Sequence, residues 1–287
     1  MDVRELLERY DIRPSKGLGQ SFLVAEWAYE RILEAAQLSA QDVVLEIGPG
    51  LGTLTHRLAQ AAHHVIAVEL DERMVNILND TLAGHDNVTV HQGDILETDL
   101  AELLEPWIGP AEPAVIYKVV ANLPYYITSR ALRHLLTAPV RPQRLVLMVQ
   151  REVADRIVAT PRDMSLLAVS VQVFGAPERV CRVPANAFYP RPNVDSAVLA
   201  VDIYPEPRVP GALLRRFFQV ARAGFQQKRK QIHNSLVANL SLNRETVTDA
   251  LEQAGIARQR RPQTLSIDEW ARLTVALYPT DDPDSQS

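Results

Sequence analysis

Four residues of this sequence are suited to holding a nucleoside or orienting an amine, and each comes at the end of a predicted strand. They are Gly48, Glu69, Asp94 and Asn122. Ligands of doubly wound sheets bind outside the carboxyl ends of the parallel strands. We therefore expect these four residues to meet at one edge of a sheet and to form the functional site there.

The turn after the first of these strands contains three glycines, Gly48, Gly50 and Gly52. Glycine takes positive φ freely and lets the backbone approach a ligand closely. The pattern is close to the dinucleotide fingerprint G-x-G-x-x-G, but its third glycine comes one position early, and Pro49 has no N–H for a phosphate. The turn predicts a nucleoside-like ligand without a pyrophosphate. A sharp strand-to-helix turn with no ligand is the simpler alternative.

Two acidic residues are placed to bind the two ends of an adenosine. Glu69 lies 17 residues after Gly52, close to the spacing expected for an acid that binds ribose hydroxyls. Asp94 can accept a hydrogen bond from an adenine amino group. The structural alternatives are a helix N-cap, which Asp71 fits better than Glu69, and an ordinary strand-to-loop turn for Asp94.

The segment from Asn122 to Tyr125, with the sequence Asn-Leu-Pro-Tyr, carries the clearest catalytic signal. The exocyclic amine of adenine is a poor nucleophile because its lone pair is delocalised into the ring. The side-chain oxygen of Asn122 and the carbonyl of Leu123 or Pro124 can accept its two N–H bonds and aim the lone pair. Tyr125 can stack on the base, which contributes about 1–3 kcal/mol. A plain Asn-Pro type turn is the alternative.

An aromatic loop, formed by Phe188 and Tyr189 and followed by Pro190 and Pro192, precedes the last predicted strand. The prolines fix φ and stiffen the loop. A rigid aromatic loop suits the clamping of a base that has been turned out of its stack. The alternative is an aromatic side chain that only packs within a loop.

Alternating strands and helices must position these residues, and they predict an α/β fold with helices on both faces of a mostly parallel sheet. The last strand follows a short turn, so we expect it to pair antiparallel and complete a mixed seven-stranded sheet. The predicted strands cover residues 43–47, 64–69, 88–92, 114–121, 144–149, 179–183 and 196–203, and the predicted helices 2–10, 26–37, 53–62, 72–82 and 165–174.

A proline-rich segment at 205–211 predicts a linker to a second, all-helical domain. We expect domain boundaries at 1–205, including an N-terminal capping loop at 1–25, and at 206–280, with a disordered tail at 281–287. The helices predicted in the second domain cover residues 212–223, 228–240, 244–254 and 267–277.

Composition excludes several classes of protein. The chain has a single cysteine, Cys181, and no histidine spacing typical of a metal site, so we expect no metal. No apolar run is long enough for a membrane helix, and the acidic N-terminus is unlike a targeting segment, which predicts a cytoplasmic protein. The net charge is −5, yet residues 205–272 contain 12 Lys and Arg against 6 Asp and Glu. This asymmetry indicates a basic face, with a solvated helical surface as the alternative.

The ordered motifs resemble those of the ribosomal RNA adenine N6,N6-dimethyltransferases of the KsgA type. The resemblance covers nearly the whole chain, although Ser21 stands where the family usually has Asn, and residues 160–167 lack a Tyr-Gly pair often seen there. The segments that carry it are 14–23, 46–55, 68–71, 93–96, 122–125, 188–198 and 224–236.

This resemblance implies a Rossmann-like class I methyltransferase fold that uses S-adenosylmethionine. It implies transfer of two methyl groups to N6 of each of two adjacent adenines near the 3′ end of small-subunit (16S) rRNA. The implied roles are donor binding by Ser21, Leu23, Gly48, Gly50, Glu69, Asp94 and Asn122, catalysis by Asn122, Leu123, Pro124 and Tyr125, stacking of the target adenine by Tyr125 and Phe188, and RNA binding by Arg222, Lys228, Arg229 and Lys230.

The implied partner is the small-subunit rRNA within a pre-30S particle, with a role in subunit biogenesis and a monomeric enzyme. Three alternatives stay open. A large-subunit rRNA adenine methylase of the macrolide-resistance type usually has Ile in place of Leu123. A DNA N6-adenine methylase favours two prolines directly after its acid or Asn. A ribosome-assembly factor would bind RNA without turnover.

Overall fold

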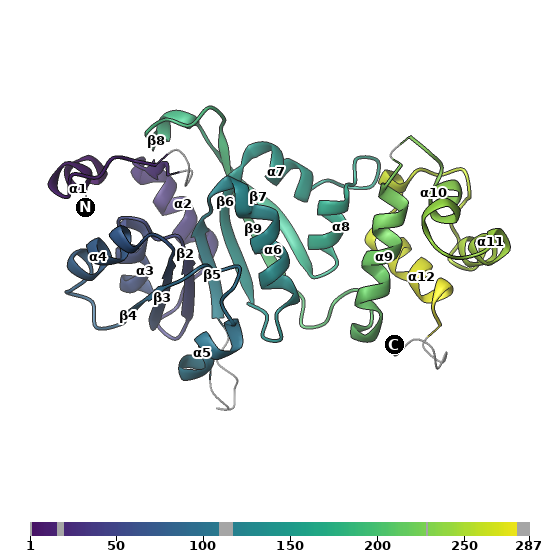
Figure 1. Ribbon diagram of the computed structural model, residues 1–287, viewed down its shortest axis with the longest axis horizontal. Helices are drawn as coiled ribbons and strands as arrows, with labels where there is room; N and C mark the ends of the chain where they lie inside the picture. Colours follow the sequence, from purple (N-terminus) through teal and green to yellow (C-terminus); the bar gives the residue numbers. More distant parts are fainter. Residues whose placement is uncertain (1, 16–19, 109–116, 228, 280–287) are drawn as a thin grey trace. The chain divides into compact units, whose positions relative to one another are not determined.

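The computed structural model describes residues 2–15, 20–108, 117–227 and 229–279 (Figure 1). Contacts between Cα atoms divide the chain into two compact units. The first, here called the sheet unit, comprises Met1–Ala154 and Pro177–Ile203, and the second, here called the helical unit, comprises Asp155–Ala176 and Tyr204–Ser287. The grouping differs from a linear division at residue 205, because 155–176 belongs with the helices that follow the sheet.

The sheet has seven strands in the order β4-β3-β2-β5-β6-β9-β7. Neighbours from β4 to β6 pair parallel, and β9 pairs antiparallel with β6. This confirms the mixed seven-stranded sheet. The strands are β2 (Val43–Ile47), β3 (His64–Glu69), β4 (Val88–Gln92), β5 (Tyr117–Asn122), β6 (Arg144–Gln150), β7 (Gly175–Val183) and β9 (Ser196–Ile203).

The strand ends that bear on the site agree closely with the sequence. Three of these strands, β2, β3 and β4, begin and end as predicted. The strand predicted at 114–121 is β5, which ends one residue later, at Asn122, while 114–116 lie outside the described residues. The edge strand β7 begins at Gly175 rather than 179, because its first residues, Gly175, Ala176 and Pro177, are of types that are depleted in strands.

Helices cover both faces of the sheet. On one face, Ile32 of α2 (Glu26–Ala36) and Leu58 of α3 (Thr53–Ala61) pack with Val44, Val65 and Val120 in one buried cluster. Figure 1 shows α6 (Thr128–Thr137) on the opposite face. The remaining helices of this region are α4 (Glu72–Thr81) and α5 (Leu100–Ile108), and α7 (Arg151–Ile157) begins in the sheet unit and ends in the helical unit. As predicted, Asp71 is the N-cap of α4, and its carboxylate accepts a hydrogen bond from the Arg73 N–H at 3.0 Å.

The N-terminal segment is tied to the sheet unit at two places. Leu6 and Leu7 of α1 (Val3–Arg9) join a buried cluster with Leu51 of the glycine turn and with α4. The two-residue strand β1 (Phe22–Leu23) pairs antiparallel with β8 (Phe188–Tyr189). The sequence did not predict this small second sheet, because strands of two residues have no periodicity to read.

The helical unit has its own core, centred on the fully buried Trp270. A Cβ added to Gly224 would lie 2.5 Å from the Cη2 atom of Trp270, so α9 and α12 pack closely there. The helices are α8 (Leu166–Gln172), α9 (Leu214–Phe225), α10 (Ile232–Asn239), α11 (Arg244–Gln253) and α12 (Ile267–Leu277).

The helix predicted at 228–240 begins only at Ile232, as α10, and Arg229 and Lys230 lie in the turn before it. The later start has a tertiary cause, because the Ile232 N–H donates to the carbonyl of Arg260 at 2.7 Å instead of to a preceding helical turn. Two predictions lie outside the described residues. They are RNA binding by Lys228 and the tail at 281–287.

Candidate functional site

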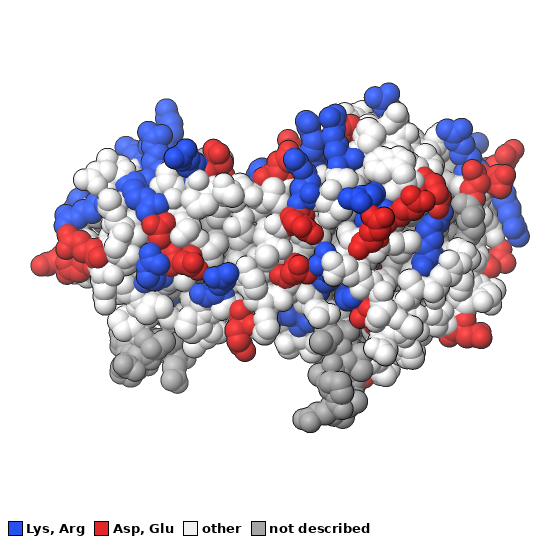
Figure 2. All heavy atoms as spheres, turned by 180° about the vertical axis from the view of Figure 1, so that it is seen from behind, with Lys and Arg blue, Asp and Glu red and all other residues white. Residues whose placement is uncertain are grey.

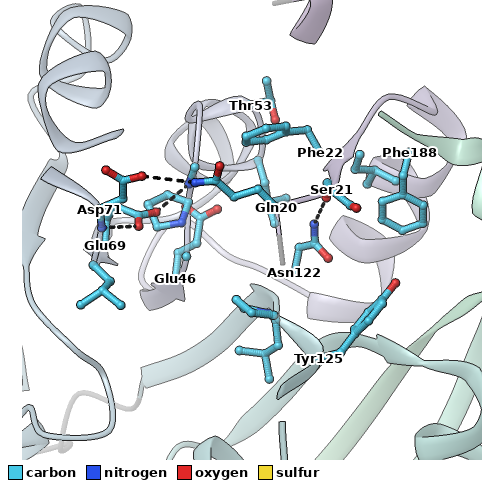
Figure 3. Close-up of a pocket in the computed structure, with 18 of the residues that line it drawn as sticks. Gln20, Ser21, Phe22, Glu46, Thr53, Glu69, Asp71, Asn122, Tyr125 and Phe188 are labelled. Carbon is cyan, nitrogen blue, oxygen red and sulfur yellow. Dashed lines mark hydrogen bonds between the residues drawn. The ribbon is translucent and has the colours of Figure 1, made fainter. Parts of the chain in front are cut away.

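A pocket lies at the carboxyl edge of the sheet unit, where the residues that follow the parallel strands were expected to meet. Its two ends differ in character, with acidic side chains at one end and aromatic rings at the other, and Asn122 between them (Figure 3). All predicted site residues of the sheet unit except Asp94 line it, namely Ser21, Leu23, Gly48, Gly50, Glu69, Asn122, Leu123, Pro124, Tyr125 and Phe188.

The glycine turn forms one wall of the pocket with a backbone that other residues rarely adopt. Gly48, Gly50 and Gly52 have φ angles of 67°, 58° and 79°. A Cβ on Gly50 would approach the Phe22 ring to 3.1 Å, so a side chain there would press against the N-terminal segment. The Gly50 N–H donates to Glu69 Oε2 at 3.1 Å. The turn is therefore fixed by an acid from the neighbouring strand.

Glu69 is buried and partly satisfied by the backbone. Its Oε1 accepts a hydrogen bond from the Asp71 N–H at 2.9 Å, in addition to the Gly50 contact at Oε2. Burial raises the pKa of this carboxyl above its ordinary value. Each oxygen keeps one further lone pair for a donor, which suits a pair of vicinal hydroxyl groups.

A second buried acid, Glu46, lines the same end of the pocket and was not singled out from the sequence. It is 1% exposed, and its Oε2 has no hydrogen-bond partner among the described residues. Burial, with a smaller contribution from the charge of Glu69, raises the pKa of Glu46 to about 8. A carboxylate within the apolar run 43–47 is the signal that could have identified it, because unpaired buried acids are costly unless a ligand uses them.

Asp94 is near this end but does not line the pocket. It follows β4, and the N–H of the preceding Gly93 donates to the Glu69 carbonyl at 2.9 Å. The Asp94 Oδ1 accepts a hydrogen bond from the Leu96 N–H at 2.9 Å, as in an ordinary Asx turn. The structure thus shows the turn role of Asp94, and its contact with adenine stays a prediction.

Asn122 lies where it can present its oxygen to an amine. Its Nδ2 is directed toward the Ser21 carbonyl at 3.5 Å, which leaves Oδ1 available to accept (Figure 3). The Pro124 carbonyl already accepts a hydrogen bond from the Ile127 N–H at 3.1 Å. The Leu123 carbonyl accepts none in the described part of the chain. Of the two carbonyls considered from the sequence, that of Leu123 is therefore the better second acceptor.

The aromatic end of the pocket is held by contacts that the sequence did not reveal. The Tyr125 hydroxyl and the Ser196 hydroxyl of β9 lie 2.7 Å apart, which fixes the plane of the Tyr125 ring. Burial raises the pKa of Tyr125, so the ring stays neutral. Phe188 is almost fully buried behind the pocket wall. The sequence could not identify Ser196, because this residue lies on β9 and meets Tyr125 only in the folded structure.

Tyr29 of α2 is a further pocket residue that the sequence did not identify. Its hydroxyl donates to the Leu23 carbonyl at 2.7 Å and lies 2.7 Å from the Thr53 hydroxyl, which must then be the donor to it. Burial raises the pKa of Tyr29 to about 12. The side chain links the N-terminal segment to the first turn of α3 and so fixes two walls of the pocket.

The predicted RNA-binding cations lie in the helical unit. Arg222 is exposed on α9, where its Nε donates to the Phe218 carbonyl at 3.1 Å. Arg229 and Lys230 are exposed in the turn before α10. None of these three makes an ion pair within the described ranges. Figure 2 shows one face of the molecule, where cationic and anionic side chains are interspersed.

The described residues contain neither a metal-binding cluster nor a membrane-spanning helix. No group of three or more His, Cys, Asp or Glu side chains there is arranged to hold a metal ion. No helix in that part of the chain combines the length and apolar character that crossing a lipid bilayer requires.

Known proteins are similar to this chain in sequence and in fold. The model of a family described as "Ribosomal RNA adenine dimethylase" matches residues 13–277. A protein of Dehalococcoides mccartyi named "Ribosomal RNA small subunit methyltransferase A" is 44% identical over 273 residues, which cover 95% of this chain and 91% of that protein.

Two solved structures resemble the structure of this chain over most of its length. The crystal structure of the 23S rRNA methyltransferase ErmE is 30% identical, with a TM-score of 0.70, and the match covers 89% of this chain and 99% of that chain. A dimethyladenosine transferase from Plasmodium falciparum is 25% identical, with a TM-score of 0.72, and the match covers 88% of this chain and 95% of that chain.

Proposed function

We infer that this chain, which belongs to the ribosomal RNA adenine dimethylase family, transfers methyl groups from S-adenosylmethionine to N6 of adenine in small-subunit rRNA. It is an S-adenosylmethionine-dependent methyltransferase with a Rossmann-like fold. The finer proposal is that two adjacent adenines near the 3′ end of the 16S rRNA each receive two methyl groups. The observation that carries the proposal is the position of Asn122 between an acidic and an aromatic end of one pocket, with no hydrogen bond to its Oδ1 from the described residues.

The acidic end of the pocket fits the donor. Glu69 has lone pairs left for ribose hydroxyls, and the unpartnered Oε2 of the buried Glu46 suits a cationic group. The positive φ at Gly48 and Gly50 leaves a cradle that a Cβ would disturb. When bound, the donor supplies a methyl group made electrophilic by the sulfonium. We propose that Ser21, Leu23, Gly48, Gly50, Glu69, Asp94 and Asn122 hold it.

The aromatic end would receive the target adenine. We propose that the base enters between Tyr125 and Phe188, turned out of its stack as in other enzymes that act on a base. Asn122 Oδ1 and the Leu123 carbonyl would accept the two N6–H bonds, which directs the N6 lone pair along the line of transfer. Pro124 keeps this segment rigid, and Tyr125, fixed by Ser196, sets the plane of the base.

Catalysis then comes mainly from positioning, which can supply roughly 7–11 kcal/mol of a barrier. The N6 atom would form the new bond to the methyl carbon as the carbon–sulfur bond of the donor breaks, and the donor would leave as a neutral thioether. The alkylated nitrogen is acidic and would lose its proton to water, so no protein base is needed. After the first transfer one N–H remains. The singly methylated adenine can bind again and use one of the two acceptors, which permits a second transfer.

The alternatives receive less support. The large-subunit methyltransferase ErmE is 30% identical to this chain, against 44% for the small-subunit relative. The residue after Asn122 is Leu123 rather than the Ile usual in large-subunit enzymes. A binding factor without turnover would not need a buried acid with an unpartnered oxygen in the pocket. Binding to the pre-30S particle, a monomeric state and a cytoplasmic location stay predictions.

The test is to incubate the protein with isotopically labelled donor and small ribosomal subunits that lack adenine methylation, and to map the product by mass spectrometry. We expect label in N6,N6-dimethyladenosine at two adjacent positions of the small-subunit RNA. Matched reactions contain large subunits or DNA in place of small subunits. Label in large-subunit RNA alone would overturn the assignment of small-subunit RNA as the substrate. Label in none of the three reactions would overturn the assignment of the protein as a methyltransferase.

A further inference from the structure

Tyr126, the residue after the proposed stacking residue, carries an aromatic ring that is not packed into the protein. It lines the pocket and is 59% exposed, the highest exposure among the large apolar and aromatic side chains that the structure describes. No hydrogen bond or ring contact engages it within the described residues. A tyrosine on the surface at the mouth of a pocket presents a free ring face to whatever enters there.

The backbone that carries Tyr126 is fixed on both sides. It occupies the centre of a one-turn 3-10 helix, η1 (Tyr125–Ile127), whose ends are held by Tyr125 and by the buried Ile127. The Thr128 hydroxyl donates to the Tyr125 carbonyl at 3.1 Å. Because the backbone is already fixed, only the side-chain torsions of Tyr126 lose freedom when a partner binds.

Two arginines continue the same exposed side. Arg130 and Arg133 follow Tyr126 at intervals of four and three residues, which places the three side chains along one side of η1 and α6. Both arginines are exposed, whereas Leu132 and Leu135 of α6 are buried against the sheet unit. Neither arginine makes an ion pair in the described part of the chain. The strip therefore has one free ring at the pocket mouth and two free cations beyond it.

We propose that Tyr126, Arg130 and Arg133, here called the docking strip, bind the RNA strand that carries the target adenine. The proposal rests on the proposed function. A base that is turned out of its stack leaves its neighbour with an uncovered face, and an aromatic ring at the pocket mouth can cover that face. Arginines next to the ring can bind the phosphates that follow, which positions the strand without reading its sequence.

The chemistry of the strip distinguishes RNA from other partners. A protein partner would favour an apolar centre with few charges, whereas this strip pairs one ring with two unpaired guanidinium groups. Arginine is the residue that best combines phosphate binding with stacking on bases. The two adenines of the proposed substrate are adjacent, so the base on Tyr126 would be the second substrate adenine when the target is its neighbour.

The experiment measures steady-state methylation of small ribosomal subunits that lack adenine methylation, with Tyr126→Ala, Tyr126→Phe and the pair Arg130→Gln with Arg133→Gln. Trp27→Ala and Arg31→Gln, exposed residues of α2 that do not line the pocket, are the matched controls. Donor affinity without RNA is measured for each variant by calorimetry, and thermal unfolding confirms that each is folded.

We expect Tyr126→Ala to raise KM for the small subunit about tenfold or more, because stacking contributes about 1–3 kcal/mol. Tyr126→Phe keeps the ring, so its KM should stay within about twofold of wild type. The arginine pair should reduce the slope of log(kcat/KM) against log(salt) by about 0.7–0.9 for each phosphate that is no longer bound. Both controls should behave as wild type.

Equal KM values for Tyr126→Ala and the Trp27→Ala control would overturn the proposal. So would a Tyr126→Ala defect that appears equally in donor affinity without RNA, because the ring would then belong to the donor pocket. An unchanged salt slope in the variant that lacks both arginines would show that Arg130 and Arg133 do not bind phosphates. If the wild-type protein methylates no small-subunit RNA, the proposed function is wrong, and the docking strip, which rests on it, is refuted as well.

Discussion

The carboxyl edge of the sheet unit and the turn before α10 in the helical unit, here called the basic turn, hold their functional side chains in opposite ways. At the sheet edge, Glu46 and Glu69 are buried, and Asn122 is held close to the N-terminal segment. In the turn before α10, Arg229 and Lys230 are exposed and make no ion pair within the described residues. Chemistry needs groups held in place, whereas attraction of a charged polymer needs groups that are free. The two regions should therefore respond differently to substitution.

The largest expected effect is at Asn122. Asn122→Ala removes one of two proposed acceptors for the adenine amine, and we expect the rate of methylation to fall by about 10²–10³-fold or more. Donor affinity, measured by calorimetry without RNA, should change far less. Near-normal turnover in this variant would remove Asn122 from the mechanism.

Glu69 tests the donor end of the same pocket. Glu69→Ala removes a carboxylate that accepts the Gly50 and Asp71 N–H bonds and leaves both donors without their partner. We expect donor affinity to weaken by about 10- to 100-fold, since hydrogen bonds to charged groups are worth about 1.5–3 kcal/mol. Calorimetric titration with the donor checks this value. A dissociation constant equal to that of wild type would contradict the assignment.

Gly224 tests whether the two regions can be disturbed separately. Gly224→Ala forces a methyl group against the buried Trp270 ring, which lies 2.5 Å from the ideal Cβ position. We expect the free energy of unfolding to fall by roughly 1–3 kcal/mol, the usual cost of overpacking. Chemical denaturation measures the decrease, and donor affinity should be unchanged at a temperature where the protein is folded. The comparison for helix propensity alone is the difference between Arg215→Ala and Arg215→Gly, because Arg215 is an exposed residue of α9.

Glu46 should make donor binding depend on pH. Burial raises the pKa of Glu46 to about 8, so without a ligand this carboxyl is mostly protonated below that value and ionised above it. A cationic donor favours the ionised form, and its affinity should therefore rise with pH by up to about tenfold per unit as pH approaches 8 and then level off. Glu46→Gln should remove this component. An identical pH profile in wild type and Glu46→Gln would contradict the role.

The smallest effect is expected in the basic turn. Arg229→Gln and Lys230→Gln each remove one exposed cation, and each should weaken binding of the small subunit by a few-fold at moderate salt. The slope of log affinity against log salt should fall by about 0.7–0.9 for each phosphate contact. Arg73→Gln, in the sheet unit, is a control in which the cation that is removed is already paired with Asp71. A salt slope that does not change would exclude these two residues from the RNA surface.

The sequence was most informative where burial dictates residue type. The strands β2, β3 and β4 could be delimited because glycine or an acid interrupts each run at the sheet edge. Asn122 and Glu69 could be placed together because parallel strands end at one edge. The helical unit was predicted less accurately. The start of α10 was misplaced because a tertiary hydrogen bond between Ile232 and Arg260 overrides the local helix propensity.

Contacts between distant segments could not be read from the sequence. The pairing of β1 with β8 brings Phe22 and Phe188 to the same pocket wall, yet neither strand is long enough to show alternation. Ser196 and Tyr29 act through hydroxyl groups whose partners lie on other elements. The grouping of residues 155–176 with the helical unit depends on packing of α8 against α9, and no local pattern marks it.

The most direct test of the contrast is single-turnover methylation of small subunits with saturating donor. The enzyme is in excess over the small subunits, at concentrations high enough that every small subunit is bound and binding no longer limits the rate. Asn122→Ala should stay slow by about 10²–10³-fold under these conditions, whereas the double variant Arg229→Gln with Lys230→Gln should reach the wild-type rate. A full rate in Asn122→Ala, or a persistent defect in the double variant at saturation, would contradict the assignment of chemistry to the sheet edge and of electrostatic attraction of the RNA to the turn before α10.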